Sequence, residues 1–298
     1  MKVSVVTDEI SADLETALEL AVRWRVDGVE IRGVGTSRYP SVSDYWLTRV
    51  PQLVAEAGIP VAAISPGLFK IPLPAPPPGN ARDLRWNDAA HFARAKQAEA
   101  LLAEHLDVLL PASIEAAHVL GTTQVICFGF DRGAGVPRGP APPVAVEVLG
   151  RAAERAHREG VRLLVETEDV CWADNGERTA ALVRAVDHPG LGVNYDATNT
   201  FCAGDARPFP DSYRPLAGLI AHVHFKDAAV DPHTGVAAFT TDGDVAWPPI
   251  LEALQRDGYT GYISVETHAR PKIASTEYML GRLRRLLDGL PPQPVRQP

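Results

Sequence analysis

The sequence predicts an α/β fold consisting of a single (β/α)₈ barrel, the TIM barrel. Three observations support this fold class: short β-rich runs alternate with longer helical patterns, eight such runs occur, and several runs are almost continuously apolar. Continuous apolar runs are typical of parallel strands that are covered by helices. Eight strands in strict alternation with helices fit a closed barrel better than an open sheet.

Eight segments are expected to form the barrel strands. Longer helical patterns lie between them, such as Asp13–Arg25, Pro143–Glu159 and Pro248–Asp257. The expected strands are Lys2–Val6, Gly28–Ile31, Pro60–Ser65, Gln124–Phe130, Arg162–Val165, Gly192–Tyr195, Ile220–Phe225 and Tyr262–Val265. No Gly-x-Gly-x-x-Gly motif follows the first strand, which argues against a dinucleotide-binding fold.

The expected helices carry start and stop signals. Ser11 is expected to cap the first helix, with Asp13 and Glu15 in its first turn, where negative charge suits the helix dipole. Glycines follow the helical stretches shortly before strands, where a left-handed residue closes a helix. These glycines are Gly28, Gly58, Gly121, Gly160 and Gly258. The turns from helix to strand are therefore expected to be short and regular.

Two proline-rich segments interrupt this pattern. Pro66–Asn80 follows the third strand and has too many prolines for a helix or a central strand. In a barrel it would lie on the catalytic face, either as a wall or lid of the site or as an irregular connection. The tail Pro291–Pro298 is expected to be disordered. One barrel domain is therefore assigned to residues 1–290, and the tail to residues 291–298.

The composition is that of an ordinary globular protein. The chain has 298 residues, of which 46% are hydrophobic, enough for a sizeable core. A formal net charge of −8 disfavours nucleic-acid and anionic-lipid partners. Three widely spaced cysteines, no signal-peptide pattern and no long apolar run predict a cytoplasmic protein that does not span a membrane. The oligomeric state is left open, a homo-oligomer included.

Residues that can bind a metal stand at the carboxyl ends of four consecutive predicted strands, on the active-site face of a barrel. They are Glu166 in LLVETE, Asp196 in VNYDATN, His224 in HVHFKD and Glu266 in YISVETH. Carboxylates gathered on one axis repel and raise one another's pKa, and a bound cation removes that conflict. Three carboxylates and one imidazole suit one Mn²⁺, Mg²⁺ or Co²⁺ ion, with Mn²⁺ favoured and Zn²⁺ as an alternative. His222 shares the inward face, but His224 lies nearer the strand end.

The chain resembles the xylose-isomerase-like (β/α)₈ barrels, which include sugar isomerases and epimerases, inosose dehydratases and endonuclease IV-type repair enzymes. The resemblance extends from TDEIS and GVEIR through VETE to NYDATN, HVHFKD and GYISVETH, of which the last three are the specific motifs. It implies one metal ion held by the same Glu166, Asp196, His224 and Glu266, with the H-x-K-D motif marking His224. Many relatives have a histidine three residues after the aspartate. Asn199 stands there in this chain, which leaves that role open.

Other residues near the strand ends are candidates for contact with the substrate. They are Asn199, Lys226, Glu168, His268, Lys70 and Trp172. Each has a structural alternative, such as a surface ion pair or solvation for the lysines and packing for the tryptophan. Trp247 is likewise expected either to stack on a sugar or to pack in the interior, and Asp227 either to contact the substrate or to form a surface ion pair. Glu30 and Arg32 at the end of the second strand are expected to bind substrate oxygens or to form a salt bridge within the barrel.

The leading hypothesis is a divalent-metal-dependent isomerase or epimerase of a sugar or related polyol. Glu166 and Glu266 would act as acid and base on opposite faces of a metal-stabilised enediolate, as the resemblance also implies. A dehydratase of the inosose dehydratase kind would use the same enediolate and expel a hydroxyl. A phosphodiesterase like endonuclease IV is less favoured because of Asn199 and the negative charge. A non-catalytic sugar-binding barrel is the remaining alternative.

Overall fold

Eight parallel strands close into a barrel in the computed structural model, which describes residues 1–74, 89–133, 136–205 and 207–292. The barrel strands are β1 (Lys2–Val6), β2 (Gly28–Ile31), β5 (Val61–Leu68), β6 (Gln124–Phe128), β7 (Arg162–Glu166), β8 (Leu191–Asp196), β9 (Ile220–Phe225) and β12 (Tyr262–Val265). Their order around the barrel is β1-β12-β9-β8-β7-β6-β5-β2. The first and last strands close the ring in register, with Val5 opposite Val265. The predicted (β/α)₈ fold is confirmed.

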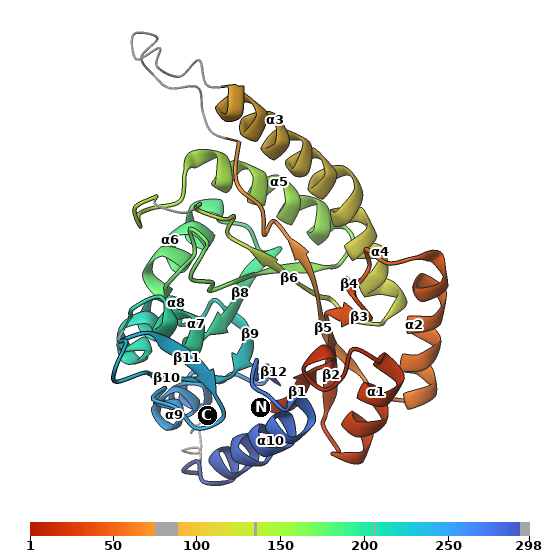
Figure 1. The fold of residues 1–298 in the computed structure, drawn as a ribbon, viewed down its shortest axis with the longest axis vertical. Helices are drawn as coiled ribbons and strands as arrows, with labels where there is room; N and C mark the ends of the chain where they lie inside the picture. Colours follow the sequence, from red (N-terminus) through yellow and green to blue (C-terminus); the bar gives the residue numbers. More distant parts are fainter. Residues whose placement is uncertain (75–88, 134–135, 206, 293–298) are drawn as a thin grey trace, which may run out of the picture.

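Helices surround this barrel on the outside (Figure 1). They are α1 (Leu14–Arg23), α2 (Asp44–Ala57), α3 (Ala89–Glu104), α4 (Leu110–Val119), α5 (Pro143–Arg158), α6 (Gly176–Val186), α7 (Ala197–Cys202), α8 (Tyr213–Leu216), α9 (Trp247–Arg256) and α10 (Lys272–Asp288), with short helices η1 (Thr7–Glu9), η3 (His105–Leu109) and η4 (Pro208–Ser212). Helix α1 buries Leu14, Leu18 and Ala21 on one face, the spacing expected of a helix that covers a sheet. None of the described helices is long and apolar enough to cross a membrane.

Two small hairpins extend the barrel where strands end. One comprises β3 (Gly33–Val34) and β4 (Ser37–Arg38) after β2. The other comprises β10 (Asp227–Val230) and β11 (Ala237–Thr240) after β9. These hairpins follow the carboxyl ends of their strands and therefore belong to the face that carries active sites in this fold.

Several local predictions differ from the structure. Asp13, not Ser11, caps α1, because its side chain accepts a hydrogen bond from the Thr16 amide at 3.0 Å. Gly28 lies inside β2. A Cβ atom there would come within 2.8 Å of the Tyr262 ring, so close packing requires this glycine. The left-handed residue after α1 is Arg25, at φ 53°. The four other predicted glycines do have positive φ values between 63° and 79°.

The proline-rich segment begins differently from its prediction. β5 continues through Pro66 to Leu68, which pairs with Cys127 of β6. The register shifts between Ile64 and Leu68, and such an irregularity accommodates a proline that cannot donate a ladder hydrogen bond. Residues 75–80 of this segment, and the predicted tail beyond residue 292, lie outside the described residues.

Candidate metal centre and active site

Four side chains meet at the carboxyl-terminal mouth of the barrel. Glu166 ends β7, Asp196 ends β8, His224 is the penultimate residue of β9, and Glu266 directly follows β12. These strands are consecutive neighbours in the barrel, so their ends converge. One ligand atom of each residue lies within 4.8 Å of the others, and all four residues are buried. We refer to these residues as the four-residue cluster.

His224 faces the three carboxylates of this cluster with an unpartnered ring nitrogen. Its Nδ1 atom lies 3.1 Å from Glu266 Oε2, 3.5 Å from Glu166 Oε1 and 3.8 Å from Asp196 Oδ2. This buried Nδ1 atom has no hydrogen-bond partner among the described residues, nor does Asp196 Oδ2. Buried polar atoms without partners usually indicate a bound ion, a ligand or a water molecule.

One amine also lies among these carboxylates. The fully buried Lys226 places its Nζ atom 2.8 Å from Glu266 Oε2 and 2.9 Å from Asp196 Oδ2. The contact with Asp196 is an ion pair without hydrogen-bond geometry. Burial raises the pKa of Asp196, and the charge of Lys226 offsets that effect only in part, so this pKa stays above its ordinary value. A single fixed amine therefore does not fully neutralise the cluster.

The donor set fits a divalent cation. Three carboxylates and one imidazole are ligands that Mn²⁺, Mg²⁺ and Co²⁺ accept, and Zn²⁺ also binds such a set. A cation would provide a partner for both unpartnered atoms, His224 Nδ1 and Asp196 Oδ2. The residues that could hold the ion are the four predicted from the strand ends.

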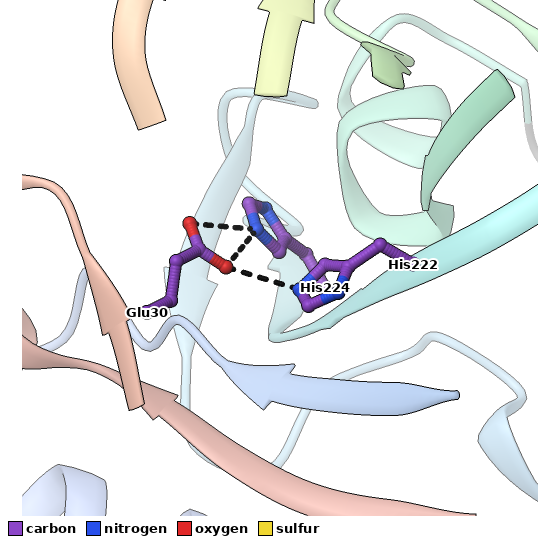
Figure 2. A group of neighbouring side chains, drawn as sticks. All are labelled: Glu30, His222 and His224. Atoms are coloured by element: carbon purple, nitrogen blue, oxygen red, sulfur yellow. Dashed lines mark hydrogen bonds and ion pairs between the residues drawn. The ribbon is translucent and has the colours of Figure 1, made fainter. Parts of the chain in front are cut away.

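A second buried group lies beside the cluster. Glu30 of β2 accepts hydrogen bonds from the Nε2 atoms of His222 and His224, at 3.1 Å and 3.0 Å (Figure 2). All three side chains are almost completely buried. His222 also lies 2.9 Å from Ser264 Oγ. Glu30 therefore pairs with histidines and not with Arg32, so the ion pairs that both residues form within the barrel have different partners.

Arg32 instead binds acidic residues at the mouth. Its guanidinium pairs with Asp8 at 2.9 Å and also with Glu9 and Glu266. His268 lies between the same two glutamates, with Nδ1 3.0 Å from Glu9 and Nε2 3.3 Å from Glu266. Burial lowers the pKa of His268, but the charge of Glu266 and hydrogen bonds to both glutamates raise it to about 9.

Glu9 is a site residue that lies outside the sequence-based prediction. Burial raises its pKa, but the hydrogen bond from His268 and the charge of Arg32 lower it to about 2. Asp8 and Glu9 come after Thr7 in the TDEIS motif, just beyond the end of the first strand at Val6. The strand-end reasoning used for the other carboxylates could therefore have found them.

Asn199 and Lys226, two of the predicted substrate contacts, bind side chains of the four-residue cluster. Asn199 Nδ2 donates to Glu166 Oε1 at 3.2 Å and to the Thr167 carbonyl at 3.0 Å. Its amide nitrogen donates to Asp196 Oδ1 at 2.8 Å. Asn199 thus orients Glu166, and Lys226 neutralises Asp196 and Glu266. Both residues nevertheless line the cavity described next.

A cavity of about 530 Å³ opens over the cluster. Lys70 and Glu168 line it and pair at 2.6 Å, and the Lys70 amine also lies 4.6 Å from the centre of the Phe128 ring. Burial and then the charge of Glu166 raise the pKa of Glu168 to about 7, although Lys70 opposes this shift. Phe239 of the β10–β11 hairpin forms another wall, with its ring 5.0 Å from that of His268. Such a mixture of charged and aromatic walls suits a small polar ligand.

The remaining candidates lie elsewhere. Trp172 is half-buried against the hydrophobic core and is not among the described residues that line the cavity. Trp247 is completely buried, packs on Phe225 and donates its indole N–H to the Lys226 carbonyl at 2.8 Å. Asp227 accepts a hydrogen bond from Arg282 at 2.6 Å, so it closes an ion pair between β10 and α10.

Comparison with known proteins identifies the family. The family model described as xylose isomerase-like TIM barrel matches residues 18–286. The fold is similar to the IOLI protein solved with a zinc atom, at 17% identity and TM-score 0.71, covering 97% of this chain and 98% of that one. It is also similar to L-ribulose 3-epimerase, at 17% identity and TM-score 0.68, covering 96% and 94%.

A third similar structure is the probable 3-DHS dehydratase AsbF from Bacillus anthracis, at 17% identity and TM-score 0.65, covering 95% of this chain and 99% of that one. At such identities the structures show a shared fold and no more. The search of curated protein sequences gave no match. Because the family model spans most of the barrel, the chain belongs to the xylose isomerase-like TIM barrel family.

Proposed function

We propose that the protein is a divalent-metal-dependent isomerase or epimerase that acts on a sugar or a related polyol. The observation that carries this proposal is the buried Nδ1 atom of His224, which faces three carboxylate oxygens within 3.8 Å and has no hydrogen-bond partner among the described residues. Membership of the xylose isomerase-like family supports the class of chemistry, and the similarity to an epimerase agrees with it.

The proposal includes one ion per chain, with Mn²⁺ favoured. Two other groups of ligand-type residues lie nearby, but each shares a residue with the four-residue cluster, His224 in one and Glu266 in the other. Their members are already joined by hydrogen bonds and ion pairs. Metal analysis of the purified protein tests this stoichiometry. More than one tightly held ion per chain would favour a phosphodiesterase instead.

The reaction requires a proton to leave one carbon and return to it or to its neighbour. The ion, when bound, polarises a substrate carbonyl and the adjacent hydroxyl, which acidifies the C–H bond beside the carbonyl. Glu166 and Glu266 come from strands that are separated by β8 and β9, so they approach the substrate from two sides. One carboxylate takes the proton while the C–H electrons form the enediolate. The other glutamate takes a proton from water and returns that proton to carbon.

Glu166 and Glu266 have different charged neighbours, and we use this difference to assign the base that removes the proton. Glu266 contacts Lys226, Arg32 and His268. Burial raises the pKa of Glu266, but these cations hold it well below its ordinary value. Burial raises the pKa of Glu166 and the charge of His224 lowers it below its ordinary value, but Glu166 pairs with no lysine or arginine among the described residues and accepts a hydrogen bond from the neutral amide of Asn199. A carboxylate among several cations is the weaker base, so Glu166 is assigned to the removal of the proton.

The test is a screen of the metal-reconstituted protein in D₂O. Ketoses, keto-inositols and their phosphates are the substrates, and deuterium incorporation is measured together with the mass of the product. Glu166→Gln and Glu266→Gln should each lower the exchange rate by about 10²–10⁴-fold, the usual effect of losing a general acid or base. Glu154→Gln is the control, because Glu154 pairs with His188 on the surface. Full turnover by Glu266→Gln on a metal-dependent substrate would contradict the proposal.

A dehydratase is the second candidate. The observation that favours it is Glu168, which lines the cavity with a pKa raised to about 7 by burial and by Glu166. A carboxyl group that is half protonated at neutral pH can donate a proton to a departing hydroxyl group. The product mass decides between the two reactions, since elimination lowers it by one water and isomerisation leaves it unchanged.

A further inference from the structure

We propose that Glu30 is a positioning residue that holds the Nε2 proton of His224 and thereby presents the Nδ1 lone pair of that ring to the metal. This inference rests on the proposed metal site but not on the identity of the substrate. Among the described residues, the Glu30 carboxylate contacts His222 and His224 and none of the three carboxylates of the four-residue cluster, so its effect on the ion passes through His224.

The hydrogen bonds determine where the proton lies. His224 Nε2 is 3.2 Å from Glu30 Oε1 and 3.0 Å from Glu30 Oε2. An ionised carboxylate can only accept hydrogen bonds, so the proton must be on Nε2. Both carboxylate oxygens of Glu30 lie within hydrogen-bond distance of a histidine Nε2 atom, and Oε2 is shared by His222 and His224. This arrangement is that of a carboxylate that accepts hydrogen bonds from both rings.

A proton on Nε2 leaves the Nδ1 lone pair of the neutral imidazole free to bind a cation. The opposite tautomer would direct a lone pair at the Glu30 carboxylate and an N–H group into the space where the ion would bind. Histidines that bind metals almost always donate their other ring N–H to a carboxylate, a carbonyl or water, and the loss of that partner typically costs about 10–100-fold in metal affinity.

Glu30 is itself held in place by a network below the cluster. His222 Nε2 lies 3.1 Å from Glu30 Oε2 and 2.9 Å from Ser264 Oγ, which in turn lies 2.6 Å from Ser4 Oγ. These residues are completely buried and come from β9, β2, β12 and β1. The network explains the second histidine of the HVHFKD motif, since His222 fixes the carboxylate that orients His224 (Figure 2).

The experiment compares the affinity of wild-type protein and Glu30→Gln for Mn²⁺ by isothermal titration calorimetry. The amide has nearly the shape of the carboxylate, but it offers one acceptor and sets an NH₂ group against a ring N–H. We expect Mn²⁺ affinity to fall about 10–100-fold. The second readout is the His224 Nε2–H proton signal of ¹⁵N-histidine-labelled protein, assigned with His222→Gln. This signal should be present in wild type and shifted or lost in Glu30→Gln.

Glu9→Gln is the matched control for charge. Glu9 is also a buried carboxylate at the mouth, but it contacts Arg32 and His268 and not His224. An equal loss of affinity in both variants would show an effect of charge alone and overturn the positioning role. Wild-type affinity in Glu30→Gln, or no Nε2–H signal in wild type, would also overturn it. If wild-type protein binds no divalent ion, the metal site itself is wrong, which is a distinct result.

Discussion

The buried carboxylate of Asp174 and the four-residue cluster differ in how neighbouring cations neutralise them. Asp174, which is completely buried, contacts three arginines: Arg132 at 2.9 Å, Arg138 at 3.6 Å and Arg178. Fixed cations outnumber the carboxylate there. In the four-residue cluster the cations are unevenly placed, because Lys226, Arg32 and His268 all contact Glu266, whereas only Lys226 also reaches Asp196. Among the described residues, no lysine or arginine pairs with Glu166.

The contrast between Asp174 and the four-residue cluster shows that burial of a carboxylate does not by itself indicate a metal site. Asp174 has no unpartnered buried oxygen, whereas Asp196 Oδ2 and His224 Nδ1 both lack hydrogen-bond partners in the described part of the chain. A buried polar atom must be paired, and the fixed cations of the cluster leave these two atoms without a hydrogen bond. The unpartnered atoms, and not the acidity, point to a bound ion.

The largest expected effect comes from Lys226→Met. Removal of the amine leaves Asp196 without its fixed cation and takes one of three cationic neighbours from Glu266. Loss of one partner of a buried pair costs about 3–5 kcal/mol of unfolding free energy. Urea unfolding of the metal-free protein measures it. Mn²⁺ should stabilise this variant more than it stabilises wild type, because the ion replaces the lost charge.

The exposed Lys96→Met is the control for Lys226→Met, and its effect should stay within about 0.5 kcal/mol. Equal stabilisation of Lys226→Met and wild type by Mn²⁺ would contradict the conclusion that the four-residue cluster, unlike Asp174, binds an ion.

Asp174→Asn tests whether the second buried carboxylate contributes to stability without contributing to metal binding. The amide keeps one hydrogen-bond acceptor, and the arginines are 11% to 43% exposed, so water solvates part of their charge. The loss should therefore be about 1.5–3 kcal/mol, the contribution of a hydrogen bond to a charged group. Denaturant unfolding measures it, and calorimetry should find Mn²⁺ affinity unchanged. A marked loss of affinity would show that the two groups are not independent.

The smallest effect is expected from Glu9→Gln and depends on pH. The pKa of Glu9 is lowered to about 2 in the folded protein, below its ordinary value of 4.5. The stability that this carboxylate contributes is therefore fully present above pH 4.5 and is lost as the pH falls toward 2. The stability difference between wild type and Glu9→Gln should shrink between pH 4.5 and pH 3 in urea unfolding. A constant difference across that range would refute the assignment.

The barrel and its strand ends could be predicted from the sequence because both depend on local pattern. Each strand is a short apolar run, and in a closed parallel barrel every carboxyl end faces the same mouth. Glu166, Asp196, His224 and Glu266 each stand at such an end, so their convergence follows once the fold is known. The prediction that these residues bind a metal still awaits the measurements proposed above.

Which buried charged residues pair with one another could be determined only from the tertiary structure. Glu30 and Arg32 are two residues apart in the sequence, yet Glu30 binds histidines of β9 and Arg32 binds Glu9 and Glu266. Contacts between residues more than 190 positions apart depend on how the barrel closes and on its register, because a shift of one residue turns each side chain to the other face of the sheet. A local pattern indicates which side chains point inward, whereas closure of the barrel determines which of them meet.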